Sequence, residues 1–150
     1  MQDMTMRSQA FNDHTMIPAE YSHASGDVSP PLEWSQAPDE VVELALICED
    51  PDAPSGTFVH WLVAGIPSDT TGLPSNDLPT EAISGRNDYG TSGYGGPHPP
   101  AGDEPHRYFF RLYGLAEPSG LQDGFSAEDF RAAVQEKIAA SGNLVGTFGR

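Results

Sequence analysis

The segment Phe58 to Ile66, FVHWLVAGI, is almost wholly apolar and rich in residues that favour strands. A strand with apolar side chains on both sides of its backbone is stable only where protein covers both faces of its sheet. The segment therefore predicts a central strand of a layered β protein. One histidine, His60, interrupts it near its start.

Two further segments are typical of strands. Val41 to Glu49 consists mostly of strand-forming residues and is broken only by Glu43. Arg107 to Leu115 alternates between two faces. The first face carries Tyr108, Phe110 and Leu112, and the second carries Arg107, Phe109, Arg111 and Tyr113. Shorter strands are expected near Phe11 to Ile17 and around Leu32 to Trp34.

One helix is expected close to the C-terminal end. Ser126 is a suitable N-cap with Asp129 three residues later. Apolar residues then recur every fourth position, which predicts one helix face packed on a sheet: Phe130, Val134 and Ile138. Gly142 is expected to end this helix as its C-cap.

The charge balance limits the classes of partner. The chain has 22 acidic and 7 basic residues, a formal net charge of −15, and one lysine, Lys137. Nucleic acids and anionic membranes bind through lysine and arginine, so we exclude both as partners. The scarcity of lysine favours adaptation to a salt-rich cytoplasm, where salt screens self-repulsion. An ordinary acidic cytosolic protein is the alternative.

Cys48 is the only cysteine, which excludes an internal disulfide and a cysteine-based zinc site. It lies in the apolar run 44–48 and is expected to be a small buried side chain. The N-terminal segment lacks the apolar stretch of a signal peptide, and no run is long enough to span a membrane. We expect a cytoplasmic protein with one domain, residues 1–150.

Candidate functional residues stand at the ends of the predicted strands. The turn Asp50-Pro51-Asp52-Ala53-Pro54 follows the first strand, and its prolines stiffen it. If the neighbouring strands share one sheet, Asp50 and His60 meet at the same edge. The alternative is a rigid turn whose aspartates cap local N–H groups.

A second group opens the strand from residue 107. His106 and Tyr108 project from one face because strand side chains alternate. The preceding loop, 89–100, is rich in glycine, whose N–H groups approach a bound group closely. Together these segments predict a small pocket with two imidazoles, a phenol and backbone amides as donors. A carboxylate from Asp50 would fix the tautomer of one histidine.

These motifs resemble the phosphatidylethanolamine-binding protein (PEBP) family, in particular its bacterial and archaeal Raf-kinase-inhibitor-like branch. The similarity covers residues 11–148 and rests on motifs in the same order: SPPLEW (29–34), DPDAP (50–54), His60-Trp61, GYGGPHPP (93–100), His106-Arg107-Tyr108 and the closing LVGTF (144–148).

The resemblance implies a mainly β fold, with a large central antiparallel sheet, a smaller second sheet and peripheral helices. It also implies a pocket for phosphate, carboxylate or phosphorylethanolamine-like groups, without metal or other cofactor. Carried over by position, the lining residues would be Asp50, Asp52, His60, His106 and Tyr108, with Gly95, Gly96 and Pro97 forming the loop wall. The sequence does not decide whether His98 joins them.

The resemblance further implies a non-catalytic binding or regulatory protein, able to act on a protein partner such as a kinase or protease, and a homodimer is a mild preference. One alternative is a hydrolase, with or without a metal ion, that uses Asp50, Asp52, His60, His98 and His106. Those are suitable metal ligands, but the sequence contains no HExxH spacing and no GxSxG elbow. A second alternative is a domain whose pocket has lost its ligand.

Composition generates the first testable prediction. If the charge of −15 reflects adaptation to salt, the melting temperature should climb steeply with KCl concentration, because salt screens repulsion among the carboxylates. Thermal unfolding followed by circular dichroism from low salt to about 1 M, where the Debye length is roughly 3 Å, measures this. Equal stability at low and high salt would end the salt-adaptation hypothesis.

Overall fold

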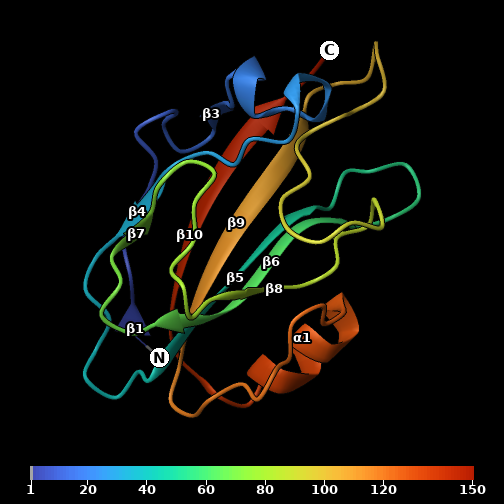
Figure 1. The fold of residues 1–150 in the computed structure, drawn as a ribbon. Coiled ribbons are helices and arrows are strands. Elements are labelled where there is room, and N and C mark those ends of the chain that lie inside the picture. The colour runs from blue at the N-terminus through green and yellow to red at the C-terminus, as the bar shows by residue number, and fades with distance from the viewer. Residues whose placement is uncertain (1) are drawn as a thin grey trace.

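The three apolar segments form the centre of the larger of two β-sheets in the computed structural model, which describes residues 2–150 (Figure 1). This sheet has seven strands. Their spatial order is β1 (Gln2–Asp3), β10 (Ile138–Phe148), β9 (His106–Leu115), β5 (Glu43–Asp50), β6 (Phe58–Pro67) and β8 (Ile83–Ser84), with β3 (Thr15–Met16) also paired to β10. The four central strands pair antiparallel, whereas β1 and β3 run parallel to β10.

The smaller sheet contains three short strands: β2 (Met6–Arg7), β4 (Leu32–Trp34) and β7 (Gly72–Leu73). The helices described are α1 (Ala127–Val134) and two short 3₁₀ turns, η1 (Ala19–Tyr21) and η2 (His23–Ser25). The mainly β architecture with a large and a small sheet is therefore confirmed. Within residues 2–150, no helix combines the length and apolarity needed to cross a membrane.

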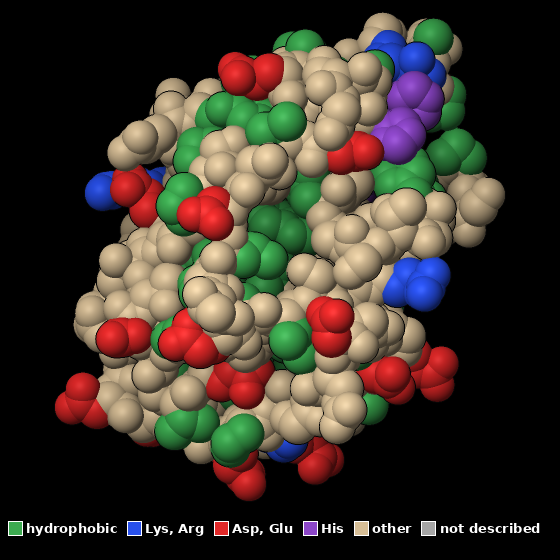
Figure 2. All heavy atoms as spheres, viewed as in Figure 1, with side chains coloured by type: hydrophobic (Ala, Val, Ile, Leu, Met, Phe, Trp, Pro, Cys, Tyr) green, Lys and Arg blue, Asp and Glu red, His purple; other side chains and the backbone are tan. Residues whose placement is uncertain are grey.

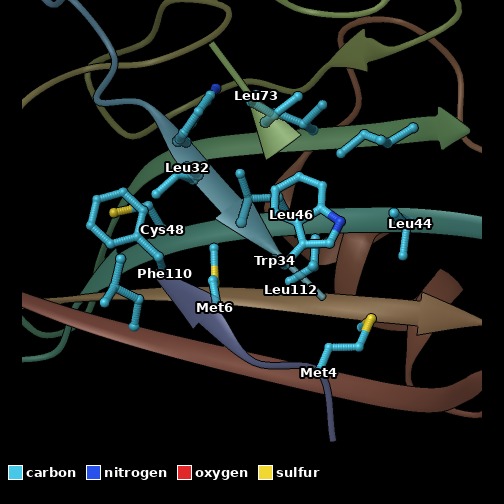
Figure 3. Close-up of a cluster of buried hydrophobic side chains, with 14 of the residues drawn as sticks. Met4, Met6, Leu32, Trp34, Leu44, Leu46, Cys48, Leu73, Phe110 and Leu112 are labelled. Atoms are coloured by element: carbon cyan, nitrogen blue, oxygen red, sulfur yellow. The ribbon is translucent and has the colours of Figure 1, made fainter. Parts of the chain in front are cut away.

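The main core lies between the two sheets (Figure 3). Trp34 and Leu32 from β4 face Leu46 from β5 and Phe110 from β9, and each of these side chains is at least 95% buried. Cys48 belongs to the same cluster, and burial raises the pKa of its thiol well above the ordinary value. The prediction that Cys48 is a small buried side chain is confirmed.

The opposite face of the large sheet is covered by α1, which lies on the far side from β4 and β7 in Figure 1. Phe130 and Val134 from the helix pack against Ile47 of β5 and Leu62 of β6. Because both faces are covered, β5 and β6 are buried along most of their length. This explains the continuous apolar sequence of β6.

The helix begins as predicted but ends early. Ser126 accepts a hydrogen bond from the Asp129 N–H at 3.0 Å, and the Asp129 side chain accepts from the Ser126 N–H, which completes a capping box. The helix then stops at Val134, and both Ile138 and Gly142 belong to β10. The prediction that Gly142 caps the helix is wrong, because apolar residues of a buried strand continued the four-residue spacing by coincidence.

Gly142 instead has a packing role at the edge of the sheet. Met4, just after β1, donates its N–H to the Ser141 carbonyl at 2.8 Å, and a Cβ on Gly142 would collide with the Met4 carbonyl. The chain can therefore cross β10 here only if the residue has no side chain.

Replacing Gly142 should consequently destabilise the protein. We expect Gly142→Ala to lower the free energy of unfolding by about 1–3 kcal/mol, as for other overpacked sites, measured by urea denaturation. Asn143→Ala is the matched control, because Asn143 is the next residue of β10 and is exposed; its effect should stay within about 0.5 kcal/mol. Unchanged stability of Gly142→Ala would contradict the close crossing.

Candidate functional site: a pocket at the end of β5

Antiparallel pairing places the end of β5 beside the beginnings of β6 and β9. Asp50 pairs with Phe58, and Glu49 lies between Val59 and Phe109. A cavity of about 210 Å³ opens at this edge of the sheet. We call it the rim pocket, and its lining residues are Asp50, Ala53, Pro54, Phe58, His60, Tyr89, His98, Pro99, Pro100, His106 and Tyr108.

Asp50 and His106 form a buried pair across the ends of β5 and β9. Asp50 Oδ2 lies 2.7 Å from His106 Nδ1, and the two residues are 3% and 5% exposed. Asp50 Oδ1 accepts the Asp52 N–H at 2.7 Å, so both oxygens have partners. The expected aspartate–histidine contact therefore exists, and it joins Asp50 to His106 and not to His60. It fixes the ring with a proton on Nδ1.

The second ring nitrogen of His106 meets another carboxylate. Asp103 Oδ2, on the loop before β9, lies 3.2 Å from Nε2, and the Asp103 side chain is 43% exposed. Burial by itself would lower the pKa of His106, but the hydrogen bonds to Asp50 and Asp103 outweigh it and raise the pKa above its ordinary value. The two carboxylates therefore favour the protonated form of the His106 ring.

His60 reaches the pocket through an irregularity in β6. Trp61 pairs with Cys48 and Val59 pairs with Glu49, so the register shifts and His60 has no paired residue on β5. Such a bulge changes the direction of a side chain relative to strict alternation. The His60 ring consequently packs against the Tyr108 ring, with 5.2 Å between the ring centroids. Both Trp61 and Tyr108 belong to the core on this side of the sheet.

A loop carbonyl orients the His60 ring. Nδ1 of His60 lies 2.7 Å from the Gly95 carbonyl oxygen, while the Gly95 N–H donates to the His60 carbonyl at 2.8 Å. Burial lowers the pKa of His60, and its attraction to Gly95, Asp50, Gly96 and Asp88 offsets this only in part. The pKa values of His60 and His106 are thus shifted in opposite directions.

Two phenols complete the polar wall. Tyr108 is 1% exposed, and burial, with the nearby Asp50 charge, raises the pKa of its hydroxyl. Tyr89 donates its hydroxyl to the Gly96 carbonyl at 2.6 Å, and burial raises its pKa too. Both phenols therefore stay neutral at physiological pH.

Asp52 does not line the rim pocket. Its carboxylate accepts from the Arg107 N–H at 2.9 Å and from the Arg107 guanidinium at 2.9 and 2.8 Å. The guanidinium hydrogen bonds lower the pKa of Asp52 to about 2. The sequence predicted that Asp52 would line the pocket together with Asp50. Arg107, however, projects from the face of β9 opposite His106, and Asp52 pairs with Arg107 on that face. The pair fastens the 50–54 turn to β9.

Gly95, Gly96 and Pro97, which the sequence predicted to form a loop wall, are not among the residues that line the rim pocket. The Gly95 N–H is bound to His60, and the Gly96 N–H donates to Asp27 Oδ1 at 2.8 Å. A Cβ on either glycine would collide with Tyr89 or with the backbone of η1. These amides therefore hold the protein together and are not free donors for a bound group.

Several pocket residues escaped the sequence reasoning. His98, which the sequence left open, lines the pocket. Tyr89 belongs to the glycine-rich loop 89–100 and was not singled out. In the structure Asn87 orders this loop through hydrogen bonds to Thr91 and Gly93. Asp103 lies in the loop before β9 and carries no motif. The one available signal was its position three residues before His106.

Histidine and acidic side chains are distributed differently over the surface in view. Figure 2 shows histidine side chains gathered at one end of the molecule, with acidic side chains scattered over the face. Within residues 2–150, no three histidine, cysteine or acidic side chains are arranged to hold a metal ion. The metal ligands suggested for a hydrolase are divided, since Asp52 pairs with Arg107 outside the pocket.

Comparisons with known proteins place this architecture in one structural class. The crystal structure of CT736 from Chlamydia trachomatis, described as a homologue of phosphatidylethanolamine-binding protein, superimposes with a TM-score of 0.91 at 34% identity, covering 100% of this chain and 99% of CT736. YbcL from E. coli, described as a new member of the mammalian PEBP family, gives a TM-score of 0.92 at 28% identity over 98% of both chains.

Sequence comparison agrees over nearly the whole length. The UPF0098 protein of Methanothermobacter thermautotrophicus is 44% identical over 152 aligned positions, covering 98% of this chain and 99% of that protein. The family model described as "Phosphatidylethanolamine-binding protein" matches residues 7–149. The chain belongs to the phosphatidylethanolamine-binding protein family.

The opposite shifts of the two imidazoles generate a prediction. In an NMR titration, His106 should lose its proton above the ordinary histidine pKa of about 6.5 and His60 below it. Asp103→Asn should lower the His106 pKa and leave that of His60 almost unchanged. Asp39→Asn, an exposed carboxylate at the other end of β5, should change neither.

The direction of the His106 pKa shift also determines how the stability of the protein depends on pH. A raised pKa in His106 contributes stability that is complete below about pH 6.5 and is lost as pH rises through the folded-state pKa. The free energy of unfolding of the wild type should therefore exceed that of Asp103→Asn by up to about 1 kcal/mol near pH 6. The difference is limited because Asp103 is partly exposed, and it should vanish at alkaline pH. A constant difference at all pH values would contradict a protonated His106.

Proposed function

We propose that this protein is a non-catalytic binding protein whose rim pocket holds a small oxyanion, such as phosphate, a carboxylate or a phosphorylethanolamine-like group. The observation that carries the proposal is the buried His106, held by Asp50 at 2.7 Å in a cavity that His60 and Tyr108 also line. A cationic imidazole and a phenolic hydroxyl are donors suited to anionic oxygens.

The size of the cavity favours a head group over a whole lipid. Pockets for drug-sized molecules usually measure about 300–1,000 Å³. The rim pocket, at about 210 Å³, suits a ligand of a few heavy atoms. The cavity is also lined by apolar side chains, so a substituent on the anion could lie along them: Ala53, Pro54, Phe58, Pro99 and Pro100.

The acidic surface works against anion binding only at long range. At 0.1 M salt the Debye length is about 10 Å, so distant carboxylates are largely screened. Asp103 is the near exception, because its carboxylate occupies His106 Nε2 and would have to move or share that nitrogen with a ligand. Selectivity would therefore come from local geometry.

Family membership supports a role in regulation or lipid recognition. Relatives such as CT736 are described by their similarity to phosphatidylethanolamine-binding protein, and the pocket has a size suited to the phosphorylethanolamine part of that lipid. An effect on a protein partner, such as a kinase or protease, would be exerted at the exposed surface around the pocket. A cytoplasmic location and a homodimer remain predictions from the sequence.

Thermal stabilisation by anions tests the proposal. Phosphate at about 100 times its dissociation constant should stabilise the folded state by about 2.7 kcal/mol, roughly 5–10 °C in melting temperature. Acetate should act in the same direction. The shift should disappear in His60→Ala and His106→Ala, and Asp39→Asn should retain it.

Ionic strength must be held constant with chloride, because the net charge of −15 makes the protein sensitive to salt in general. If neither phosphate nor acetate raises the melting temperature at any salt concentration, the proposed function is wrong. A shift that survives in both histidine variants would show that the anion binds elsewhere.

A further inference from the structure

We propose that the rim pocket selects oxyanions that carry a proton, such as hydrogen phosphate, over oxyanions of equal charge that carry none, such as sulfate. This inference rests on the proposed function, since it concerns the ligand class of the same pocket. It arises from the arrangement of His60, whose hydrogen-bonding direction is set by the backbone of the glycine loop.

The Gly95 carbonyl determines where His60 carries its proton. A carbonyl oxygen only accepts hydrogen bonds, so the 2.7 Å contact requires a proton on Nδ1. In a neutral imidazole the other nitrogen is then an acceptor. The hydrogen bond of defined geometry at the His60 ring is the one from Nδ1 to the Gly95 carbonyl, and the ring lines the cavity. The pocket therefore presents a lone pair to its ligand.

The loop backbone around Gly95 is held in place by hydrogen bonds and packing. The Gly95 N–H is bound to the His60 carbonyl, so residue 95 is attached to residue 60 at two points. Tyr89 lies so close behind Gly95 that a Cβ there would collide with its ring. The position of the Gly95 carbonyl is consequently fixed by packing before any ligand arrives.

The surroundings keep His60 neutral. The ring is 4% exposed and packs against Phe58, Tyr89 and Tyr108, all uncharged. The charged groups facing it are Asp50 on β5 and Asp88 on the loop, and both favour protonation, but burial opposes them more strongly.

A ligand must therefore supply a donor as well as acceptors. Tyr108 can donate to one oxygen of the anion, and His106 Nε2 can donate to another once the Asp103 carboxylate gives up that nitrogen. His60 Nε2, in contrast, needs an O–H or N–H. Hydrogen phosphate offers that O–H. Sulfate has acceptors alone at neutral pH, and one anionic oxygen would face the lone pair of Nε2. An unmatched buried polar group of this kind weakens binding by about tenfold to a hundredfold.

Isothermal titration calorimetry at pH 8 provides the direct test, because inorganic phosphate is then mainly the hydrogen phosphate dianion and sulfate has the same charge. With ionic strength matched, phosphate should bind at least about tenfold more tightly than sulfate. Equal affinity, or tighter binding of sulfate, would overturn the inference while leaving the proposed function standing. If phosphate itself fails to bind, the proposed function is the part that fails.

Methyl phosphate extends the test to a ligand that loses its proton. The second pKa of a phosphate monoester is about 6, so the monoester keeps a P–OH at pH 5 and lacks it at pH 8. Its affinity should fall across this range by about tenfold more than that of inorganic phosphate, which controls for deprotonation of His106. Parallel curves for the two ligands would contradict the proton requirement.

Phosphorylethanolamine at pH 8 identifies the source of the donor. Its phosphate is then fully ionised, but its ammonium group can donate to Nε2. Binding tighter than that of methyl phosphate would show that an ammonium satisfies the same requirement. Affinities equal to that of methyl phosphate would limit the accepted donor to an O–H on phosphorus.

A variant and a spectroscopic measurement identify the residue responsible. His60→Gln offers an amide N–H₂ in place of the lone pair, so the ratio of phosphate to sulfate affinity should fall towards one. His14→Asn is the matched control: His14 is exposed with φ 64°, a conformation that asparagine tolerates, and the ratio should stay as in wild type.

If His60→Gln does not fold, the tautomer of His60 in the wild-type protein still tests the inference. Long-range ¹⁵N–¹H spectra at pH 8 should show neutral His60 with its proton on Nδ1. A proton on Nε2 would remove the basis of the inference.

Discussion

The antiparallel pairing of β5 with both β6 and β9 is the constraint on which the rest of the structure depends. Because each neighbour runs opposite to β5, the point where β5 ends is the point where the other two begin. Asp50, His60 and His106 are separated by up to 56 positions in the chain, yet they line one cavity for this reason. Both faces of these strands are covered, which gives the pocket a rigid base.

Much of this arrangement could be predicted from the sequence. Long apolar or alternating segments identified β5, β6 and β9 within two residues at each end, because burial on two faces leaves a strong signal. The N-terminus of α1 was predicted correctly because a capping box is a local interaction. The C-terminus was not, since the choice between helix and strand for Ile138–Phe148 depends on pairing with distant β9.

The candidate site, like the fold, could be predicted only in part. Asp50, His60, His106 and Tyr108 were predicted to share a pocket, and the structure places all four in its lining. The roles of Asp52, Gly95 and Gly96 could not be inferred, because they depend on which atom each one meets across the fold. The irregular register at His60 is likewise invisible in the sequence, since a bulge arises from the relation between two strands.

Three prolines in the lining of the pocket limit the ways in which it can recognise a ligand. Pro54, Pro99 and Pro100 lack a backbone N–H and already have a fixed φ. A ligand group that lies against these prolines therefore meets no backbone donor from them, and this part of the lining loses little conformational freedom when the ligand binds. Discrimination at this part of the lining would depend on shape and apolar contact, so ligands with the same head group could be distinguished by the width of the substituent attached to it.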